Sequence, residues 1–289
     1  MKTERPSNRF AGFILINSSQ YNKQYCEHPH YKRIVTEEGK FNMAKPNPRV
    51  LEVIRTAYIT PHMCRVTLGG AGLADFPVDQ ESAYIKLIFP QGEDARPLMR
   101  TYTVSVQRDD EIDVDFALHD VEGPASTWAR NTQAGDQILV GGPGPKKLIN
   151  NEADWFLLIG DMTALPAITV NLAQLPDDAR GYAVIEVTTE ADRQTLKKPE
   201  NVDIHWVINA EPNAESCPLL EHTKTLTWLA GEPAVWAACE FHSMRALRQY
   251  FKVERPIAKT HLYISSYWKV DNTEDQHKIE KRNDAESAA

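Results

Sequence analysis

A change in the spacing of apolar residues near residue 152 most constrains the fold of this 289-residue chain. Before it, short β-prone runs are split by turns, and apolar residues alternate with polar ones, most regularly over residues 112–118. After it, five runs are apolar almost without interruption, as expected of parallel strands that are buried on both faces. The sequence therefore predicts two successive domains with different kinds of sheet.

The first of these domains is predicted to be a small antiparallel barrel, because it contains six short strands and little helix. The strands are expected at residues 49–55, 64–68, 83–89, 100–106, 112–119 and 137–140. In the fifth strand the alternation predicts core positions at Ile112, Val114, Phe116 and Leu118, and outward positions at Asp113, Asp115 and His119. A turn and a short helix are expected from Gly123, where free backbone N–H groups and the helix dipole suit a phosphate.

The second domain is predicted to be an α/β domain with a parallel sheet and right-handed crossovers. Its strands are expected at residues 155–159, 184–187, 205–208, 234–238 and 261–264. Helices are expected at 163–173, 217–228 and 241–252, with a shorter turn near 191–196. Ligands of such sheets bind beyond the carboxyl ends of the strands.

These elements divide the chain into four segments. Residues 1–42 are expected to form a loosely ordered extension, 43–152 the barrel, 153–270 the α/β domain and 271–289 a charged, solvated tail that is helical with a frayed end.

Composition excludes several classes of protein. No run approaches the roughly 18 apolar residues of a membrane span, and no signal-peptide cleavage site is evident, so the cytoplasm is the expected location. A net charge of −8 disfavours nucleic acid as a partner. The four cysteines, Cys26, Cys64, Cys217 and Cys239, form no C-x-x-C pair, which favours reduced thiols over disulfides, zinc or an iron–sulfur cluster. A monomer is expected.

The run from Met99 to Val106 combines residue types that suit a flavin. Side chains two apart on a strand share a face, so Arg100 can fork onto a diphosphate while Tyr102 lies against a flat ring, and Thr103 offers a hydroxyl. The alternative is an edge strand with a surface arginine. Downstream motifs decide between these interpretations.

Five motifs follow in a characteristic order, and the chain resembles the siderophore-interacting proteins, the cytoplasmic ferric-siderophore reductases within the ferredoxin-reductase-like flavoproteins. The resemblance covers about residues 48–270. The motifs are HDVEGPASTWA at 119–129, Gly135-Asp136, Gly142-Pro143, IGDMTALPAI at 159–168 and Ser266-Tyr267-Trp268.

The resemblance implies FAD between the two domains, with Arg100 on the pyrophosphate, Tyr102 against the isoalloxazine and Thr103 near its N5. It also places His119 and the helix start in contact with phosphate or adenosine. The implied cofactor-binding residues are Arg100, Thr101, Tyr102, Thr103, His119, Gly123, Pro124, Ala125, Ser126, Trp128, Asp161, Thr163 and Ala164. Trp128 has an alternative role in the core of the barrel domain.

The family's substrate is an iron chelate, thought to be held by basic residues over the flavin. Lys86 occupies the matching strand position. The family's Gly-Pro-Arg-Gly turn is replaced here by Gly142-Pro143-Gly144-Pro145-Lys146-Lys147, so Lys146 or Lys147 is expected to substitute for the arginine. Arg245 or Arg248 is the candidate for the third cation, although a solvated surface charge is the alternative for each.

The electron donor is left open between NAD(P)H and ferredoxin. Met162 stands where the family commonly has glutamate, Cys239 stands where it usually has glycine, and no G-x-G-x-x-G follows any parallel strand. Cys239 itself has no paired cysteine or evident base, which favours a buried structural role.

The expected function is reduction of a ferric siderophore with release of ferrous iron, without catalytic acid or base residues and without a protein metal site. Two alternatives remain: an NAD(P)H-dependent flavin or ferredoxin reductase without siderophore specificity, and a siderophore-binding shuttle that transfers no electrons. A metabolic α/β enzyme would need a nucleophile and base that the sequence does not show.

Overall fold

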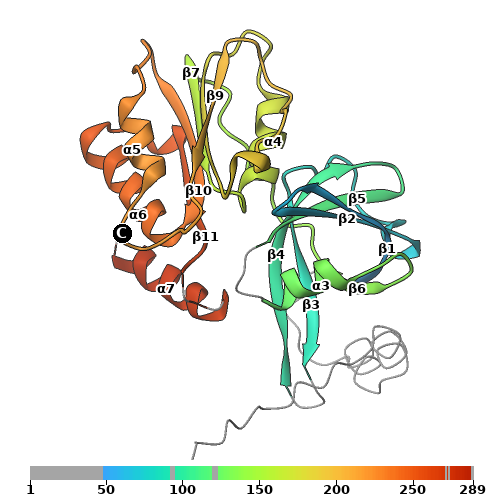
Figure 1. Ribbon diagram of the computed structural model, residues 1–289. Coiled ribbons are helices and arrows are strands. Elements are labelled where there is room, and N and C mark those ends of the chain that lie inside the picture. Colours follow the sequence, from blue (N-terminus) through green and yellow to red (C-terminus); the bar gives the residue numbers. More distant parts are fainter. Residues whose placement is uncertain (1–47, 92–94, 119–122, 271, 273, 288–289) are drawn as a thin grey trace, which may run out of the picture. The chain divides into compact units, whose positions relative to one another are not determined.

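The computed structural model describes residues 48–91, 95–118, 123–270, 272 and 274–287 (Figure 1). The expectations for the extension 1–42, for Cys26 and for His119 fall outside these residues. The boundaries predicted for the four segments stay predictions.

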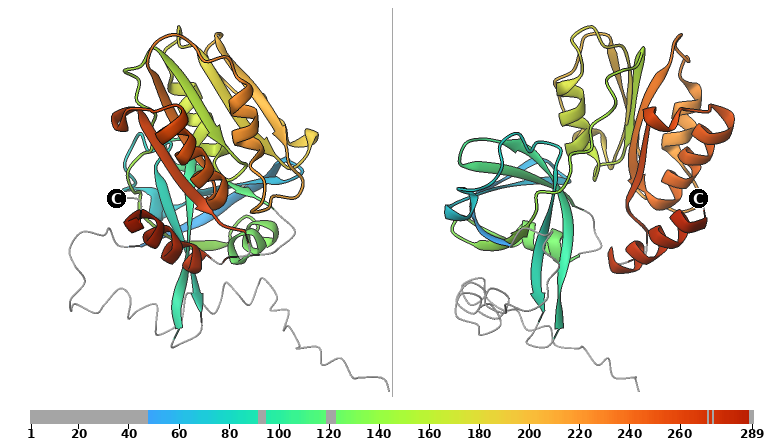
Figure 2. Two further views of the ribbon diagram at one scale, coloured as in Figure 1. Left: turned by 90° about the vertical axis from the view of Figure 1, so that its left-hand side faces the viewer. Right: turned by 180° about the vertical axis from the view of Figure 1, so that it is seen from behind.

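The first half of the described chain closes into a six-stranded antiparallel barrel, as predicted (Figure 2). Neighbouring strands follow the order β1-β2-β5-β4-β3-β6, which returns to β1. The strands are β1 (Arg49–Thr60), β2 (Met63–Gly69), β3 (Tyr84–Gln91), β4 (Ala95–Gln107), β5 (Glu111–Ala117) and β6 (Gln137–Gly141). A 3-10 turn, η1 (Ala71–Leu73), follows β2, and helix α3 (Pro124–Asn131) precedes β6.

The predicted alternation along β5 is confirmed on its inner side. Ile112, Val114 and Phe116 are fully buried in the barrel core, and Leu118, just beyond the strand, is 5% exposed. The prediction was incomplete on the other side. Asp113 points away from the apolar core but is only 3% exposed, because other polar side chains cover it.

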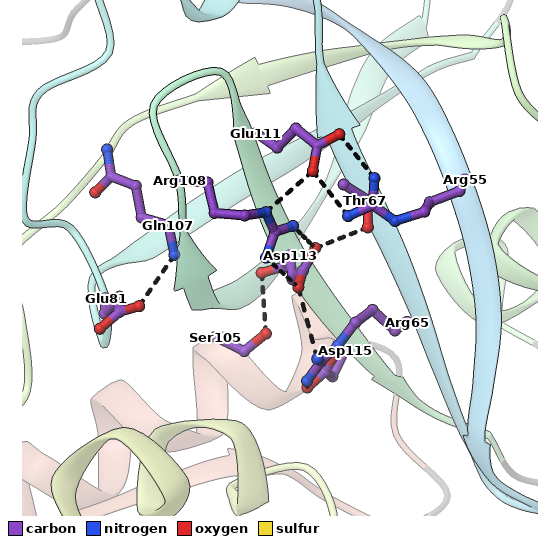
Figure 3. Close-up of polar contacts among 10 residues, drawn as sticks. All are labelled: Arg55, Arg65, Thr67, Glu81, Ser105, Gln107, Arg108, Glu111, Asp113 and Asp115. Carbon is purple, nitrogen blue, oxygen red and sulfur yellow. Dashed lines mark hydrogen bonds and ion pairs between the residues drawn. The ribbon is translucent and has the colours of Figure 1, made fainter. Parts of the chain in front are cut away.

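A network of charged side chains covers this outer face of the barrel (Figure 3). Arg108 donates two hydrogen bonds to Asp113, at 3.0 and 2.5 Å, and Thr67 donates a third at 2.7 Å. Two further arginine–carboxylate pairs are bidentate, Arg65 with Asp115 and Arg55 with Glu111. Three arginines thus face three carboxylates, and the pKa of Asp113 is lowered although burial alone would raise it.

The second half forms a five-stranded parallel sheet in the order β11-β10-β7-β8-β9, which confirms the predicted α/β architecture. Its strands are β7 (Trp155–Gly160), β8 (Gly181–Val187), β9 (Val202–Ile208), β10 (Pro233–Glu240) and β11 (Leu262–Trp268). Every residue of β7 and β10 is buried, which explains their uninterrupted apolar sequences.

Helices cover both faces of this sheet (Figures 1 and 2). Helix α4 packs its apolar residues on one face, while α5 and α6 pack on the other. The bounds are α4 (Leu165–Gln174), α5 (Pro218–Thr225), α6 (Phe241–Gln249) and the 3-10 turn η2 (Glu190–Asp192). After α6 the chain makes a π turn (η3, Tyr250–Glu254) and a 3-10 turn (η4, Lys259–His261). Helix α5 ends three residues before the predicted bound.

The C-terminal helix α7 (Glu274–Ser287) forms in the predicted charged tail, and most of its described side chains are exposed, as expected of a solvated helix; His277 and Asp284 are among the exceptions. His277 is only 4% exposed, and the Asp284 carboxylate forms a bidentate pair with Arg248. These polar contacts attach α7 to the α/β domain. The sequence did not indicate this attachment, because the segment has no stripe of apolar residues. No helix in the described part of the chain is long and apolar enough to cross a membrane.

Candidate flavin and chelate site

The two strands β3 and β4 form a ribbon whose opposite faces carry different parts of the predicted site. Tyr102 pairs across the ribbon with Ile85, and Arg100 pairs with Leu87; both partners are fully buried in the barrel core. Thr101 pairs with Lys86, whose ammonium donates a hydrogen bond to the Thr101 hydroxyl. Since successive residues of a strand face opposite ways, Arg100 and Tyr102 share one face and Lys86 and Thr101 share the other.

The face that carries Tyr102 presents aromatic rings. The ring of Tyr102 lies 4.3 Å from that of Phe116, centroid to centroid, and Phe116 lies 5.8 Å from Trp128. Tyr102 and Trp128 are both half-buried against the barrel core. Trp128 therefore fulfils the core role given as its alternative, while its partly exposed surface leaves contact with a ligand open.

Helix α3 begins at the predicted anion-binding turn. Pro124 occupies the first turn, and the Ser126 hydroxyl accepts a hydrogen bond from Gly123 N and donates one to Gly123 O, both at 3.0 Å. Ser126 and Ala125 are buried. Among the described residues, a methyl group added to Gly123 would come within 4 Å of the Ser126 hydroxyl alone, at 3.8 Å.

These residues fit the binding of FAD. A guanidinium and a helix N-terminus both suit a diphosphate, and a half-exposed tyrosine ring offers a flat apolar surface to an isoalloxazine. Arg100 is half-buried on β4, where it donates to the carbonyl of Met99 at 3.1 Å. Glycine at position 123 has no side chain that would hinder a close approach of phosphate to the backbone.

The Gly-Pro turn after β6 distinguishes the two candidate lysines. The ammonium of Lys146 forms an ion pair with Asp79 at 2.7 Å. The carbonyl of Lys147 accepts hydrogen bonds from Trp236 Nε1 at 2.8 Å, Asn171 Nδ2 at 3.2 Å and Ser82 Oγ at 3.3 Å. Three separate parts of the chain thus fix the backbone of Lys147, leaving its side chain to act elsewhere.

The turn is shaped by glycine. A Cβ at Gly144 would lie 2.1 Å from the ring of Tyr84, and Gly142 has a φ of +108°, which L residues with side chains rarely adopt. A side chain as large as arginine at position 144 would collide with the ring of Tyr84 where it lies here.

Lys281, on α7, is a residue that sequence reasoning missed. Its ammonium donates to the Ser265 hydroxyl and to the Ser266 carbonyl, both at 2.8 Å. Burial, followed by the charges of Lys86 and Lys147, lowers the pKa of Lys281. Lys86, Lys147 and Lys281 come from distant segments, and the charges of the first two act on the third; we call these three residues the lysine cluster.

The two arginines predicted as the third cation have another partner. Arg248 binds Asp284 through hydrogen bonds of 2.6 and 2.8 Å, and Arg245 approaches the same carboxylate at 3.3 Å. Among the described residues, no contact joins either arginine to Lys86 or Lys147. Both arginines hold α7, and α7 in turn supplies Lys281.

Asp161 lies at the carboxyl end of β7 and joins three strand ends. One oxygen accepts from Thr163 N at 2.9 Å and from its hydroxyl at 2.5 Å; the other accepts from Glu240 N at 2.8 Å and Trp268 Nε1 at 2.7 Å. Ala164 is fully buried beside Gly160. Donors from the protein itself thus already bind both oxygens of Asp161. Thr163 is the residue of this turn that keeps exposed surface.

Other buried groups stand beside Asp161 on the sheet. Burial, and secondarily the charge of Asp161, raises the pKa of Glu186 to about 7. Burial likewise raises the pKa of the Cys239 thiol well above its ordinary value. Cys64, Cys217 and Cys239 are free thiols, as predicted. Within the ranges that the structure describes, no three His, Cys, Asp or Glu side chains could hold a metal ion together.

The barrel, the parallel sheet and the arginine–tyrosine face define a flavoprotein of the ferredoxin-reductase-like class. The ferredoxin-NADP⁺ reductase of Plasmodium falciparum has the same fold, with a TM-score of 0.55 at 14% identity, over 76% of this chain and 97% of that one. Residues 52–94 and 91–147 match the siderophore-interacting FAD-binding domain, and residues 153–271 match the siderophore-interacting protein model.

The chain belongs to the siderophore-interacting protein family. It is 33% identical to the ferric vibriobactin reductase ViuB of Vibrio cholerae over 256 residues, 81% of this chain and 94% of that protein. The siderophore-interacting protein SipS of Aeromonas hydrophila is 31% identical, with a TM-score of 0.74 over 83% of this chain and 98% of that one. The chain is an FAD-dependent oxidoreductase.

Proposed function

We propose that this protein is a cytoplasmic, monomeric ferric-siderophore reductase, which passes electrons to the iron of an Fe(III)-siderophore and releases Fe(II). The observation that carries the proposal is the position of the lysine cluster. Lys86 shares one face of the β3–β4 ribbon with Thr101 and Thr103, both proposed to contact FAD, while Arg100 and Tyr102 lie on the opposite face. A cationic surface thus adjoins the flavin-binding residues, and a relative of this chain is named for ferric vibriobactin reduction.

FAD would be held by residues of both structural parts. In this proposal Arg100 and the start of α3, from Gly123 to Ser126, bind the phosphates, while Tyr102 and Trp128 present ring surfaces. The remaining proposed contacts are Thr101, Thr103, His119 and Thr163; Asp161 and Ala164, which are buried, shape the end of β7 instead. Bound FAD accepts electrons in a pair and gives them up singly, which suits a one-electron metal acceptor.

The protein's own part in the iron step is electrostatic. Fe(III) chelated by anionic oxygen donors is a negatively charged substrate, and three ammonium groups attract and orient it. We propose Lys86, Lys147 and Lys281 as its contacts, in place of the arginines and in preference to Lys146, whose charge Asp79 balances. Reduction to Fe(II) weakens the oxygen ligands and frees the metal, so no protein ligand for iron is needed.

The electron donor is proposed to be NAD(P)H or ferredoxin. The parallel sheet has the fold of a nicotinamide-binding domain, while the fully hydrogen-bonded Asp161 and the buried Cys239 at its carboxyl edge favour no particular dinucleotide contact.

One experiment tests both ends of this electron path. The yellow holoprotein is reduced anaerobically with NADH, NADPH or reduced ferredoxin, and is then mixed with catecholate and hydroxamate ferric chelates while flavin reoxidation is followed. We expect reoxidation by at least one chelate class, and slower capture by Lys86→Ala with FAD content unchanged. Lys146→Ala is the matched control.

Two outcomes would favour the alternatives. Rapid oxidation of NAD(P)H with generic acceptors but none with ferric chelates would identify a general flavin or ferredoxin reductase. A colourless protein that binds ferric chelates without taking up FAD would identify a shuttle.

A further inference from the structure

Helix α7 is held to the sheet by a histidine that no flavin or iron chemistry requires. His277 is 4% exposed, and its Nε2 lies 2.6 Å from the hydroxyl oxygen of Ser266 in β11. Its ring also packs edge-on against Phe241, with 6.1 Å between centroids. Among the described residues of this very polar helix, His277 is the buried one.

Lys281 lies four residues after His277, so both side chains project from the same face of α7. The ammonium of Lys281 donates to the Ser265 hydroxyl and the Ser266 carbonyl. The two side chains therefore bind adjoining residues of β11, Ser265 and Ser266. The hydrogen bond of His277 fixes the turn of α7 from which Lys281 extends.

The lysine cluster needs such a constraint. Like charges repel, and a lysine stem has four rotatable bonds that let the ammonium turn toward solvent. Lys86 is held by the Thr101 hydroxyl on the barrel ribbon. Lys281 comes from a helix that is attached by the Arg248–Asp284 pair and by the contacts of His277 with Ser266 and Phe241. Displacement of α7 would relieve the repulsion and remove the third cation from the cluster.

The hydrogen bond between His277 and Ser266 suits the positioning of α7, because it adds no positive charge beside the lysine cluster. Burial, with a secondary contribution from the Lys281 ammonium, lowers the pKa of His277 to about 4. The imidazole is therefore neutral near pH 7 and adds no fourth cation beside the lysines.

We propose that His277 is a positioning residue for the ferric chelate: through its hydrogen bond to Ser266 it holds α7 so that the Lys281 ammonium keeps its place on Ser265 and Ser266. The inference deepens the proposed function and rests on it. It assigns to the C-terminal helix the completion of an anion-binding surface whose other two cations come from the barrel strand β3 and the turn after β6.

The test compares two substitutions that keep different properties of His277. His277→Phe keeps a ring against Phe241 but removes the hydrogen bond, whereas His277→Gln can place an amide nitrogen near the position of Nε2. For holoenzyme with an anionic ferric catecholate, we expect His277→Phe to raise KM about fivefold with kcat unchanged, and His277→Gln to stay near wild type. Ile279→Ala, exposed on the same helix, is the control.

A double-mutant cycle separates positioning from a general effect on the fold. If His277 acts through Lys281, His277→Phe adds no further rise in KM to the Lys281→Ala protein. Equal increases in both backgrounds, or a wild-type KM in His277→Phe, would overturn the proposal. Should His277→Phe lose its flavin or fold poorly, Ser266→Ala removes the same hydrogen bond, keeps the carbonyl that Lys281 uses, and carries the same expectation.

Failure of the proposed function gives a different result. Wild-type holoenzyme would then reduce no ferric chelate with any donor, and its flavin fluorescence would not respond to added ferric catecholate. An active wild type whose KM ignores both His277 and Lys281 would contradict this inference alone.

Discussion

The outer face of β5 and the lysine cluster are both rich in charge, yet they are built in opposite ways. Around β5, Arg55, Arg65 and Arg108 meet three carboxylates in bidentate or paired contacts (Figure 3). In the lysine cluster, burial and then the charges of Lys86 and Lys147 lower the pKa of Lys281. A balanced network gains stability from its contacts, whereas like charges held together cost stability and make sense where an anion must bind.

The largest effect is expected in the charge network on the outer face of β5. Asp113→Ala leaves Arg108 and Thr67 without their shared buried acceptor, so we expect the free energy of unfolding to fall by about 2 kcal/mol, a value reduced for the partial exposure of Arg108. Denaturant titration of the holoprotein measures this. Asp75→Ala, which removes an exposed partner of Arg49, should change stability little, and the KM for chelate should not change in either variant. A large KM effect of Asp113→Ala would show that the two regions are not separate.

In the turn after β6, the adjacent residues Lys146 and Lys147 are expected to differ in their effect on chelate binding. Lys147→Ala should raise KM for an anionic ferric chelate about tenfold, equivalent to about 1.4 kcal/mol, while stability stays constant or increases because repulsion is relieved. Lys146→Ala should have little effect on KM, since Asp79 already neutralises that charge. Steady-state kinetics with a saturating donor measures both. Equal increases in KM in Lys146→Ala and Lys147→Ala would show that the position of the lysine along the turn does not affect chelate binding.

Salt should affect the two regions unequally. Raising the ionic strength from about 0.05 to about 0.5 M shortens the screening length well below 10 Å, so KM for the chelate should rise about threefold. Partly buried bidentate pairs are screened less, and the thermal midpoint should change little. A KM that is independent of salt would argue against electrostatic capture.

The smallest expected effect is in the alkaline pH dependence. Binding of an anion needs Lys281 protonated, and its lowered pKa means that the charge is lost at a lower pH than for an ordinary lysine. KM should therefore rise by about twofold at alkaline pH below the usual lysine range. Lys281→Arg should move this limb to higher pH, because guanidinium stays charged. If Lys281→Ala showed the same rise in KM at alkaline pH, the titrating group would be a residue other than Lys281.

Much of the architecture could be predicted because it depends on local periodicity. The alternation through Ile112, Val114 and Phe116 placed the barrel core, and the uninterrupted apolar runs placed the buried parallel strands. The shared face of Arg100 and Tyr102, which we propose binds the flavin, could also be predicted, because residues two apart share a face of any extended strand.

The proposed chelate site was only partly predictable. Lys86 followed from its strand position, but the choice between Lys146 and Lys147 depended on an ion pair with Asp79, which lies 67 positions earlier in the chain. Arg245 and Arg248 face α7 and its Asp284, a contact that no sequence period indicates. The i, i+4 spacing of His277 and Lys281 was the available signal, but in a helix without an apolar stripe it also fits a solvated face.

By itself, then, the sequence determined which segments become strands and which side chains share a face, because those properties depend on neighbours a few residues away and on the burial of apolar surface. Only the tertiary structure decided which charges are balanced and which are left to bind an anion. Electrostatic partners are set by distance in space, and the partners here come from segments that the chain brings together only on folding.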